Sequence, residues 1–160
     1  MVQFNSDKRS LFRSKNRIAV HNLPPWIEDA QAFINNCTKC ADCISICPEQ
    51  IITKGDGGYP QIDFNLGECS FCGKCADICN EQIFTTTDQT PWNKKAQIST
   101  LCLAAQNIYC RSCAESCESL ALTFKIGINA LPQINTELCT GCGACVSPCP
   151  AQAIEIKELQ

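Results

Sequence analysis

The chain has little of what most enzymes and membrane proteins require. It contains one histidine, His21, and a lone histidine is far more often structural than catalytic. Its apolar runs fall short of the roughly 18 residues that a membrane-spanning helix needs, so we do not expect an integral membrane protein. Glycine-rich phosphate loops and nucleophile elbows are also missing. We therefore expect no enzyme active site.

Cysteine is the residue that the chain has in excess, with 16 in 160 residues. A first group, spaced C-x2-C-x2-C-x3-C and followed by Pro48, is typical of the iron–sulfur proteins called bacterial ferredoxins. This group comprises Cys37, Cys40, Cys43 and Cys47. The same spacing recurs at Cys69, Cys72, Cys75 and Cys79, and again at Cys139, Cys142, Cys145 and Cys149.

A remaining group of cysteines is irregular. Cys110, Cys113 and Cys117 keep its last three positions, but Asn107 stands at the first. Cys102, five residues upstream, is the natural fourth ligand. The alternative is that Cys102 is a buried free cysteine, which would leave its metal site incomplete.

The second pair of groups repeats the first pair at an offset of 70 residues, as from Cys40 to Cys110 and from Cys69 to Cys139. This repeat predicts two related halves rather than four independent metal fingers. In two-cluster ferredoxins, the fourth cysteine of each group ligates the other cluster. We therefore expect four [4Fe-4S] clusters in four sites. Site I takes Cys37, Cys40, Cys43 and Cys79; site II takes Cys69, Cys72, Cys75 and Cys47; site III takes Cys102, Cys110, Cys113 and Cys149; site IV takes Cys139, Cys142, Cys145 and Cys117.

Structural zinc and a disulfide scaffold are the alternatives at this cysteine density. Zinc ribbons present two separated C-x2-C pairs, so a third cysteine after two further residues is surplus to a tetrahedral site. Disulfides need an oxidising compartment, and residues 1–21 lack the apolar core of a signal peptide. Iron–sulfur clusters are therefore the expectation.

The pattern predicts an α+β fold, a duplicated bacterial-type two-cluster ferredoxin. We expect a basic arm at 1–25, one half at 26–87, a linker at 88–97 and a second half at 98–160. Each half should contain a small hairpin, from residues 50–53 and 59–64 and from residues 120–125 and 131–134. Apolar residues from Trp26 to Ile34 recur at helical spacing, which predicts a short helix ahead of the first group.

Charge is unevenly distributed along the chain. The formal net charge is -3, but residues 1–21 carry five basic side chains against Asp7 and so contribute +4. Ligated thiols are deprotonated, so four clusters would take the total to about -11. The basic arm is either a solvated tail or a segment that docks a partner protein. Nucleic acid is not an expected partner, because few aromatic residues interleave these charges.

Several segments are distinctive beyond the regular cysteine spacing. They are the basic residues Lys8, Arg9 and Arg13, the Pro-Pro-Trp at Pro24, the Cys-Thr-Lys-Cys at Cys37, the Gly-Gly-Tyr-Pro at Gly57, the Cys-Ser-Phe-Cys at Cys69 and the irregular Cys102-Leu103-Ala104. With these segments the chain resembles the NapF-type ferredoxins of the bacterial periplasmic nitrate reductase system. Ser10 departs from the family, which tends to have glycine there.

The resemblance implies a cytoplasmic accessory protein without enzymatic activity. It would contact the catalytic molybdenum subunit of nitrate reductase before export and assist insertion or reductive maturation of that subunit's iron–sulfur cluster. Spacing alone indicates only a multi-cluster one-electron protein. A general electron carrier and a cluster donor with a labile site III therefore stay open as alternatives.

Halves this small have little hydrophobic core, so metal ligation should supply much of the folding free energy. We expect removal of iron with a chelator to leave the chain largely disordered. Circular dichroism of the chelated protein measures this directly. A native spectrum after complete loss of iron would show that the fold stands without its clusters.

Overall fold

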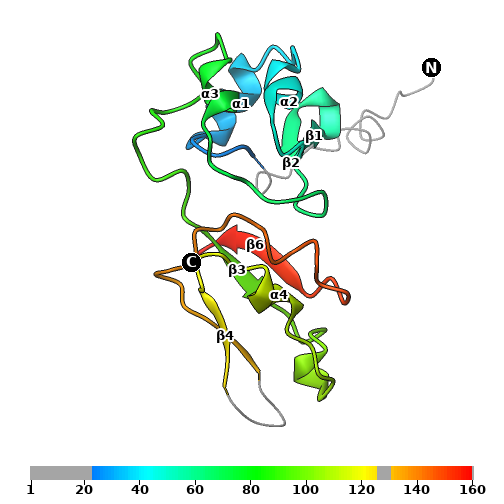
Figure 1. The fold of residues 1–160 in the computed structure, drawn as a ribbon. Helices are drawn as coiled ribbons and strands as arrows, with labels where there is room; N and C mark the ends of the chain where they lie inside the picture. Colours follow the sequence, from blue (N-terminus) through cyan, green and yellow to red (C-terminus); the bar gives the residue numbers. More distant parts are fainter. Residues whose placement is uncertain (1–22, 126–130, 160) are drawn as a thin grey trace, which may run out of the picture.

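The computed structural model describes residues 23–125 and 131–159. Figure 1 shows their elements in two lobes, one stacked on the other. The first lobe (residues 23–92) holds three α-helices and one hairpin, and the second lobe (93–125 and 131–159) holds two pairs of strands and one α-helix. Most of the expected arm at 1–25 lies outside the described residues. The mixture of short helices and strands confirms the α+β class.

The first helix, α1 (Ala30–Asn36), begins later than the apolar spacing predicts. Asp29 is its N-cap, and the carboxylate accepts hydrogen bonds from the backbone N–H groups of Gln31 (2.8 Å) and Ala32 (3.1 Å). Trp26 stays outside the helix with a φ of 62°. The helix buries Phe33, which is 1% exposed, against Leu23 and Ile83.

Both expected hairpins are present. In the first lobe, β1 (Ile52–Lys54) pairs antiparallel with β2 (Pro60–Ile62) across a turn that contains the 3-10 helix η3 (Asp56–Gly58). In the second lobe, β4 (Leu122–Phe124) pairs with β5 (Pro132–Ile134). The hairpins place Ile52 and Leu122 in the cores of their lobes.

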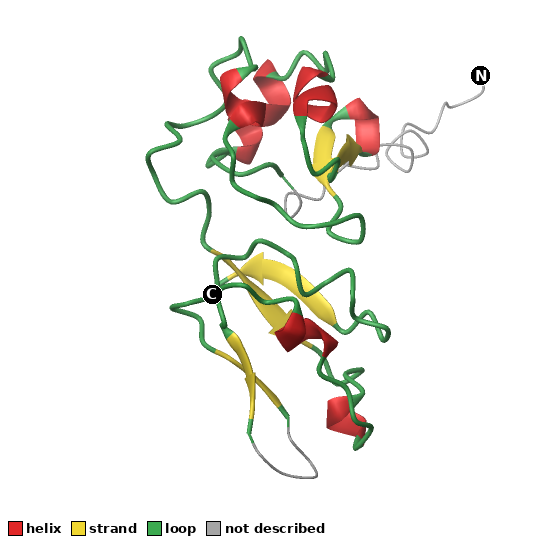
Figure 2. Ribbon diagram, in the orientation of Figure 1, coloured by secondary structure: helices red, strands yellow, loops and turns green. Residues whose placement is uncertain are grey.

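The longest strand pair was not anticipated from the sequence. Strand β3 (Lys94–Ile98) runs antiparallel to β6 (Ile154–Glu158), and the two join the beginning and the end of the second lobe (Figure 2). The segment expected as a linker, 88–97, is therefore a strand in its last four residues. Ala96, Ile154 and Ile156 from this pair lie buried in one hydrophobic cluster, which explains why the segment is ordered as a strand.

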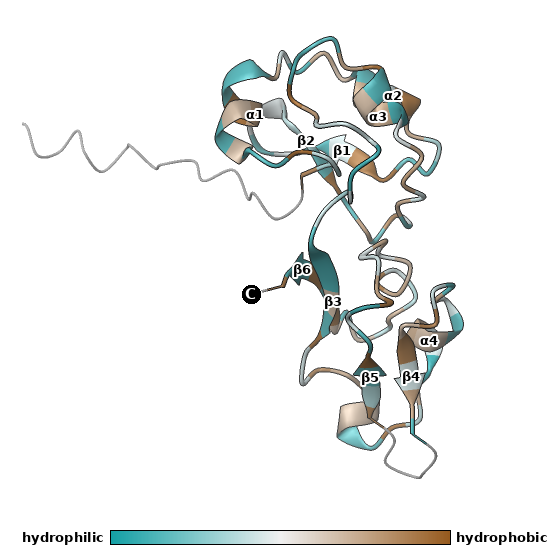
Figure 3. Ribbon diagram, turned by 90° about the vertical axis from the view of Figure 1, so that its left-hand side faces the viewer, coloured by the Kyte–Doolittle hydropathy of each residue, from teal (hydrophilic) through white to brown (hydrophobic). Residues whose placement is uncertain are grey.

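The remaining helices lie within the cysteine groups. They are α2 (Asp42–Ile46), α3 (Lys74–Asp77), α4 (Ser112–Glu115) and the 3-10 helix η4 (Ala104–Gln106). Figure 3 shows both hydrophilic and hydrophobic residues on the short helices α2, α3 and α4. Among the described residues, no helix is both long and apolar enough to span a bilayer.

Lys94 is the one charged side chain in the buried set of the described residues, at 6% exposure. Its Nζ donates a hydrogen bond to the Leu23 carbonyl at 3.3 Å and lies 4.7 Å from the centre of the Trp92 ring. Burial lowers its pKa to about 8, against the attraction of Glu158, which raises it. The folded chain thus releases this proton at lower pH than the unfolded chain, whose lysine value is 10.5.

Because the unfolded state holds more protons between these values, stability should rise as the pH climbs from about 8 to about 10.5. We expect a gain of roughly 1–3 kcal/mol from this lysine, and we expect Lys94→Met to abolish it. Unfolding midpoints of the iron-loaded protein at about pH 7 and about pH 9.5 measure the gain. The control is Lys157→Met, at a side chain that is 51% exposed. The assignment would be wrong if the unfolding midpoint of the wild type changed with pH by the same amount as that of Lys94→Met.

Candidate metal centres

All sixteen cysteines lie within the described residues, and each carries a free thiol. Site I is a cavity lined by the four cysteines that spacing assigned to it: Cys37, Cys40, Cys43 and Cys79. Phe33, Ile83 and Phe84 complete the apolar wall. The pKa of Cys43 rises to about 11, first through burial and then through Cys37, Cys40 and Cys79. The last thiol therefore comes from the neighbouring group, as the crossed pattern predicts.

Site II has the reciprocal arrangement. Its cavity is lined by Cys47, Cys69, Cys72 and Cys75, with Trp26, Ile51 and Ile52 among its apolar neighbours. Burial, followed by Cys69, Cys43 and Cys72, raises the pKa of Cys75 to about 12. The influence of Cys43 shows that sites I and II adjoin within the first lobe.

Site III contains the irregular cysteine. Cys102, Cys110, Cys113 and Cys149 line one cavity, together with Leu103, Phe124 and Ile154. Burial raises the pKa of Cys113 to about 11, and Cys102, Cys110 and Cys149 add to the shift. The backbone N–H of Ala153 donates to the Cys149 sulfur at 3.3 Å. The structure thus brings Cys102 to the place that its upstream position suggested.

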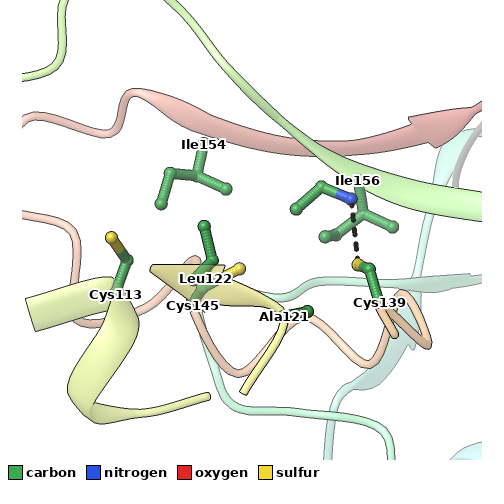
Figure 4. Close-up of a cluster of buried hydrophobic side chains, with 8 residues drawn as sticks. Cys113, Ala121, Leu122, Cys139, Cys145, Ile154 and Ile156 are labelled. Carbon is green, nitrogen blue, oxygen red and sulfur yellow. Dashed lines mark hydrogen bonds between the residues drawn. The ribbon is translucent and has the colours of Figure 1, made fainter. Parts of the chain in front are cut away.

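Site IV is assembled in part. Cys145 is buried, and its pKa rises to about 12 through burial and then through Cys142, Cys139 and Cys113. Figure 4 shows Cys113, Cys139 and Cys145 around Ile154 and Ile156 of β6. Cys117 packs against the same hydrophobic cluster. The structure therefore brings three thiols of the site together, and the fourth, Cys117, lies beside the same hydrophobic cluster.

Cys117 also differs from the other thiols in its electrostatics. Burial alone would raise its pKa, but the Ser119 hydroxyl and the backbone N–H groups of Leu122, Ala121 and Ser119 lower it overall. The Ser119 Oγ lies 3.5 Å from the sulfur. Such N–H and O–H donors favour a thiolate and tune a cluster bound to it.

Unusual backbone conformations recur at the cysteine groups. Gln50, Leu120 and Gln152 have positive φ values of 53°, 53° and 47°. Each donates its backbone N–H to the carbonyl of the cysteine three residues earlier, at 3.2, 3.0 and 3.1 Å. Left-handed residues other than glycine persist only where the surroundings require them. The same type of turn therefore follows the last cysteine in three of the groups.

The donor sets fit iron–sulfur clusters. In the part of the chain that the structure describes, no three His, Cys, Asp or Glu side chains converge closely enough for one metal ion. Thiols that surround a cavity suit a multi-iron cluster better than a single tetrahedral zinc ion.

Sequence reasoning missed the aromatic side chains around site II. Phe71 lies between two cysteines of that site, and its ring contacts Trp92 at 5.5 Å and Trp26 at 6.5 Å between centroids. Trp92 also contacts Phe64 at 6.1 Å. The only signal in the sequence is that these residues stand close to the cysteine groups. Aromatic residues at irregular spacing form no recognisable motif.

Comparisons with known proteins agree with this chemistry. Residues 36–84 match the family described as 4Fe-4S dicluster domain, and residues 132–155 match the 4Fe-4S binding domain. The chain is 45% identical to Ferredoxin-type protein NapF of Haemophilus influenzae over 86% of this chain and 79% of that protein. It is 37% identical to the protein of the same name from Escherichia coli K12, over 99% and 98%. No solved structure is a significant match. The cysteine groups and these families together support binding of [4Fe-4S] clusters.

Replacement of Cys102 tests its place in site III. We expect Cys102→Ser to lower the iron content by about four atoms per chain, because a cluster left with three thiolates is labile. Leu101→Ala is the matched control, since its side chain is 59% exposed and does not line the cavity. Iron and acid-labile sulfide assays give the count. Unchanged iron in Cys102→Ser would make Cys102 a free cysteine.

Proposed function

The chain belongs to the family of NapF ferredoxin-type proteins, and from that membership we propose that it is a cytoplasmic accessory protein of periplasmic nitrate reductase. In this proposal it binds the catalytic molybdenum subunit before export and assists insertion or reductive maturation of that subunit's iron–sulfur cluster. The observation that carries the proposal is the likeness to the NapF proteins over nearly the whole chain, 99% of it for the protein from Escherichia coli K12.

The proposal includes four [4Fe-4S] clusters, one in each of sites I to IV with the ligands given above. Bound clusters would supply one-electron transfer. The surrounding residues exclude water with apolar walls and donate N–H groups to sulfur, as Ala153 does to Cys149 and Ala96 to Cys139. The duplicated layout is part of the same proposal: both lobes carry a hairpin of similar register, and α2 and α4 lie at equivalent positions of the repeat.

The site offers binding and electron transfer rather than substrate chemistry. The three cavities that are lined by four cysteines are walled mainly by apolar side chains, and within the described residues no histidine stands beside them. A general electron carrier would use the same clusters. The two functions differ in their client: a carrier supports turnover of the mature enzyme, whereas a maturation factor acts only while the client is immature.

The basic residues 1–21 are proposed to dock the partner. Their charge of +4 contrasts with a remainder of -7 before cluster binding, so they offer the chain's one concentrated site for an acidic surface. We expect deletion of residues 1–21 to weaken binding of the cluster-free catalytic subunit at least ten-fold, which corresponds to about 1.4 kcal/mol. Titration calorimetry under anaerobic conditions measures the affinity.

Two controls make this experiment decisive. A variant with Lys8, Arg9, Arg13, Lys15 and Arg17 replaced by glutamine keeps the length but removes the charge, and it should bind as weakly as the deletion. The mature, cluster-loaded subunit should bind neither form. Equal binding of mature and immature subunits, together with support of nitrate reduction by the mature enzyme, would favour the electron carrier instead.

A further inference from the structure

The two lobes touch through their cysteine loops. The backbone N–H of Cys69, in site II, donates a hydrogen bond of 2.8 Å to the carbonyl of Cys142, in site IV. No sequence motif predicts this contact, because the two groups belong to different halves of the repeat. The bond places the loop 139–145 directly against the loop 69–75.

Aromatic residues of the first lobe close this contact. The indole Nε1 of Trp92 donates to the carbonyl of Thr140 at 3.2 Å. The same ring contacts Phe71 of the site II loop at 5.5 Å. Phe64 packs against the hydrophobic clusters of both lobes. The site IV loop is thus held by its backbone on one side and by a tryptophan on the other.

Two glycines make the approach of the loop possible. A Cβ on Gly143 would overlap the Phe64 ring, lying only 2.6 Å from its Cγ atom. A Cβ on Gly141 would overlap the Lys94 carbonyl and lie 2.9 Å from Trp92 Nε1. Gly143 therefore meets Phe64 of the first lobe, whereas Gly141 meets both Trp92 of the first lobe and Lys94 of its own lobe.

The repeat supplies an internal comparison for Gly143. Gly73 occupies the equivalent place 70 residues earlier, and its φ of 75° is close to the 87° of Gly143. A Cβ on Gly73, however, would come no closer than 3.2 Å to its nearest neighbour, the Cγ2 atom of Thr87. The backbone conformation therefore favours glycine at both positions, but only at Gly143 would a side chain also strike the other lobe.

We propose that Gly141 and Gly143 are positioning residues, which dock the site IV loop onto the site II loop and so make this contact the place where the two halves exchange electrons. The inference rests on the proposed four-cluster content. The exchange balances within the protein: one half is oxidised by one electron, the other is reduced by the same electron, and no external oxidant is needed. The docked loops keep the two sites adjacent.

Paramagnetic resonance of the dithionite-reduced, iron-loaded protein tests the docking, because spin–spin interaction between reduced clusters falls steeply with their separation. We expect Gly143→Ala to lose part of the interaction seen in the wild-type spectrum. Gly73→Ala is the matched control: it imposes similar backbone strain at the same repeat position and should keep the wild-type interaction. An unchanged spectrum in Gly143→Ala with full iron would overturn the proposal, and so would an equal loss in Gly73→Ala.

If Gly143→Ala loses iron, a second variant still tests the proposal. Adding Phe64→Ala to it removes the ring that the new methyl group strikes, and the single Phe64→Ala variant gives the baseline. We expect the double variant to regain both the iron and the spin–spin interaction of that baseline. Failure to regain them would overturn the proposal. Iron and sulfide in the wild type test the four-cluster content separately, so failure of that content and failure of the docking are distinguishable.

Discussion

The structure depends on one constraint, that thiols from separate stretches of chain must meet around each cavity. Cys79 closes the cavity of the first cysteine group, and Cys47 closes that of the second, so neither group completes its site alone. The hairpins contribute only three residues per strand, and the buried cores are correspondingly small. We therefore expect cluster ligation to supply folding free energy that a large hydrophobic core supplies in other proteins.

The same constraint explains why the sequence predicted the sites better than the connections between them. The spacing of the cysteine groups predicted which thiols line the cavities of sites I to III, and both expected hairpins are present. Ligation by these cysteines, Cys102 included, stays a prediction. Strand β3 was not predicted, because it begins with Lys94 and Lys95 and lysine is unfavourable in a buried strand. The start of α1 was misplaced because the capping carboxylate of Asp29 outweighs the apolar spacing of Trp26 and Ile27.

How the halves meet could not be predicted, because it depends on contacts between residues that share no motif. Gly73 and Gly143 occupy the same repeat position with similar backbone angles, yet only Gly143 faces an aromatic ring of the other lobe. The loops 69–75 and 139–145 become neighbours through the backbone hydrogen bond between Cys69 and Cys142, together with Trp92 and Phe64. The contact between the lobes is therefore one that neither lobe contains by itself.

The most direct measurement of the central claim is the iron and acid-labile sulfide content of the wild-type protein, purified without oxygen. Four [4Fe-4S] clusters predict about sixteen of each per chain. About twelve would contradict the assignment of a cluster to site III and to Cys102. About eight of each, or zinc in place of iron, would contradict the account of four cluster sites as a whole.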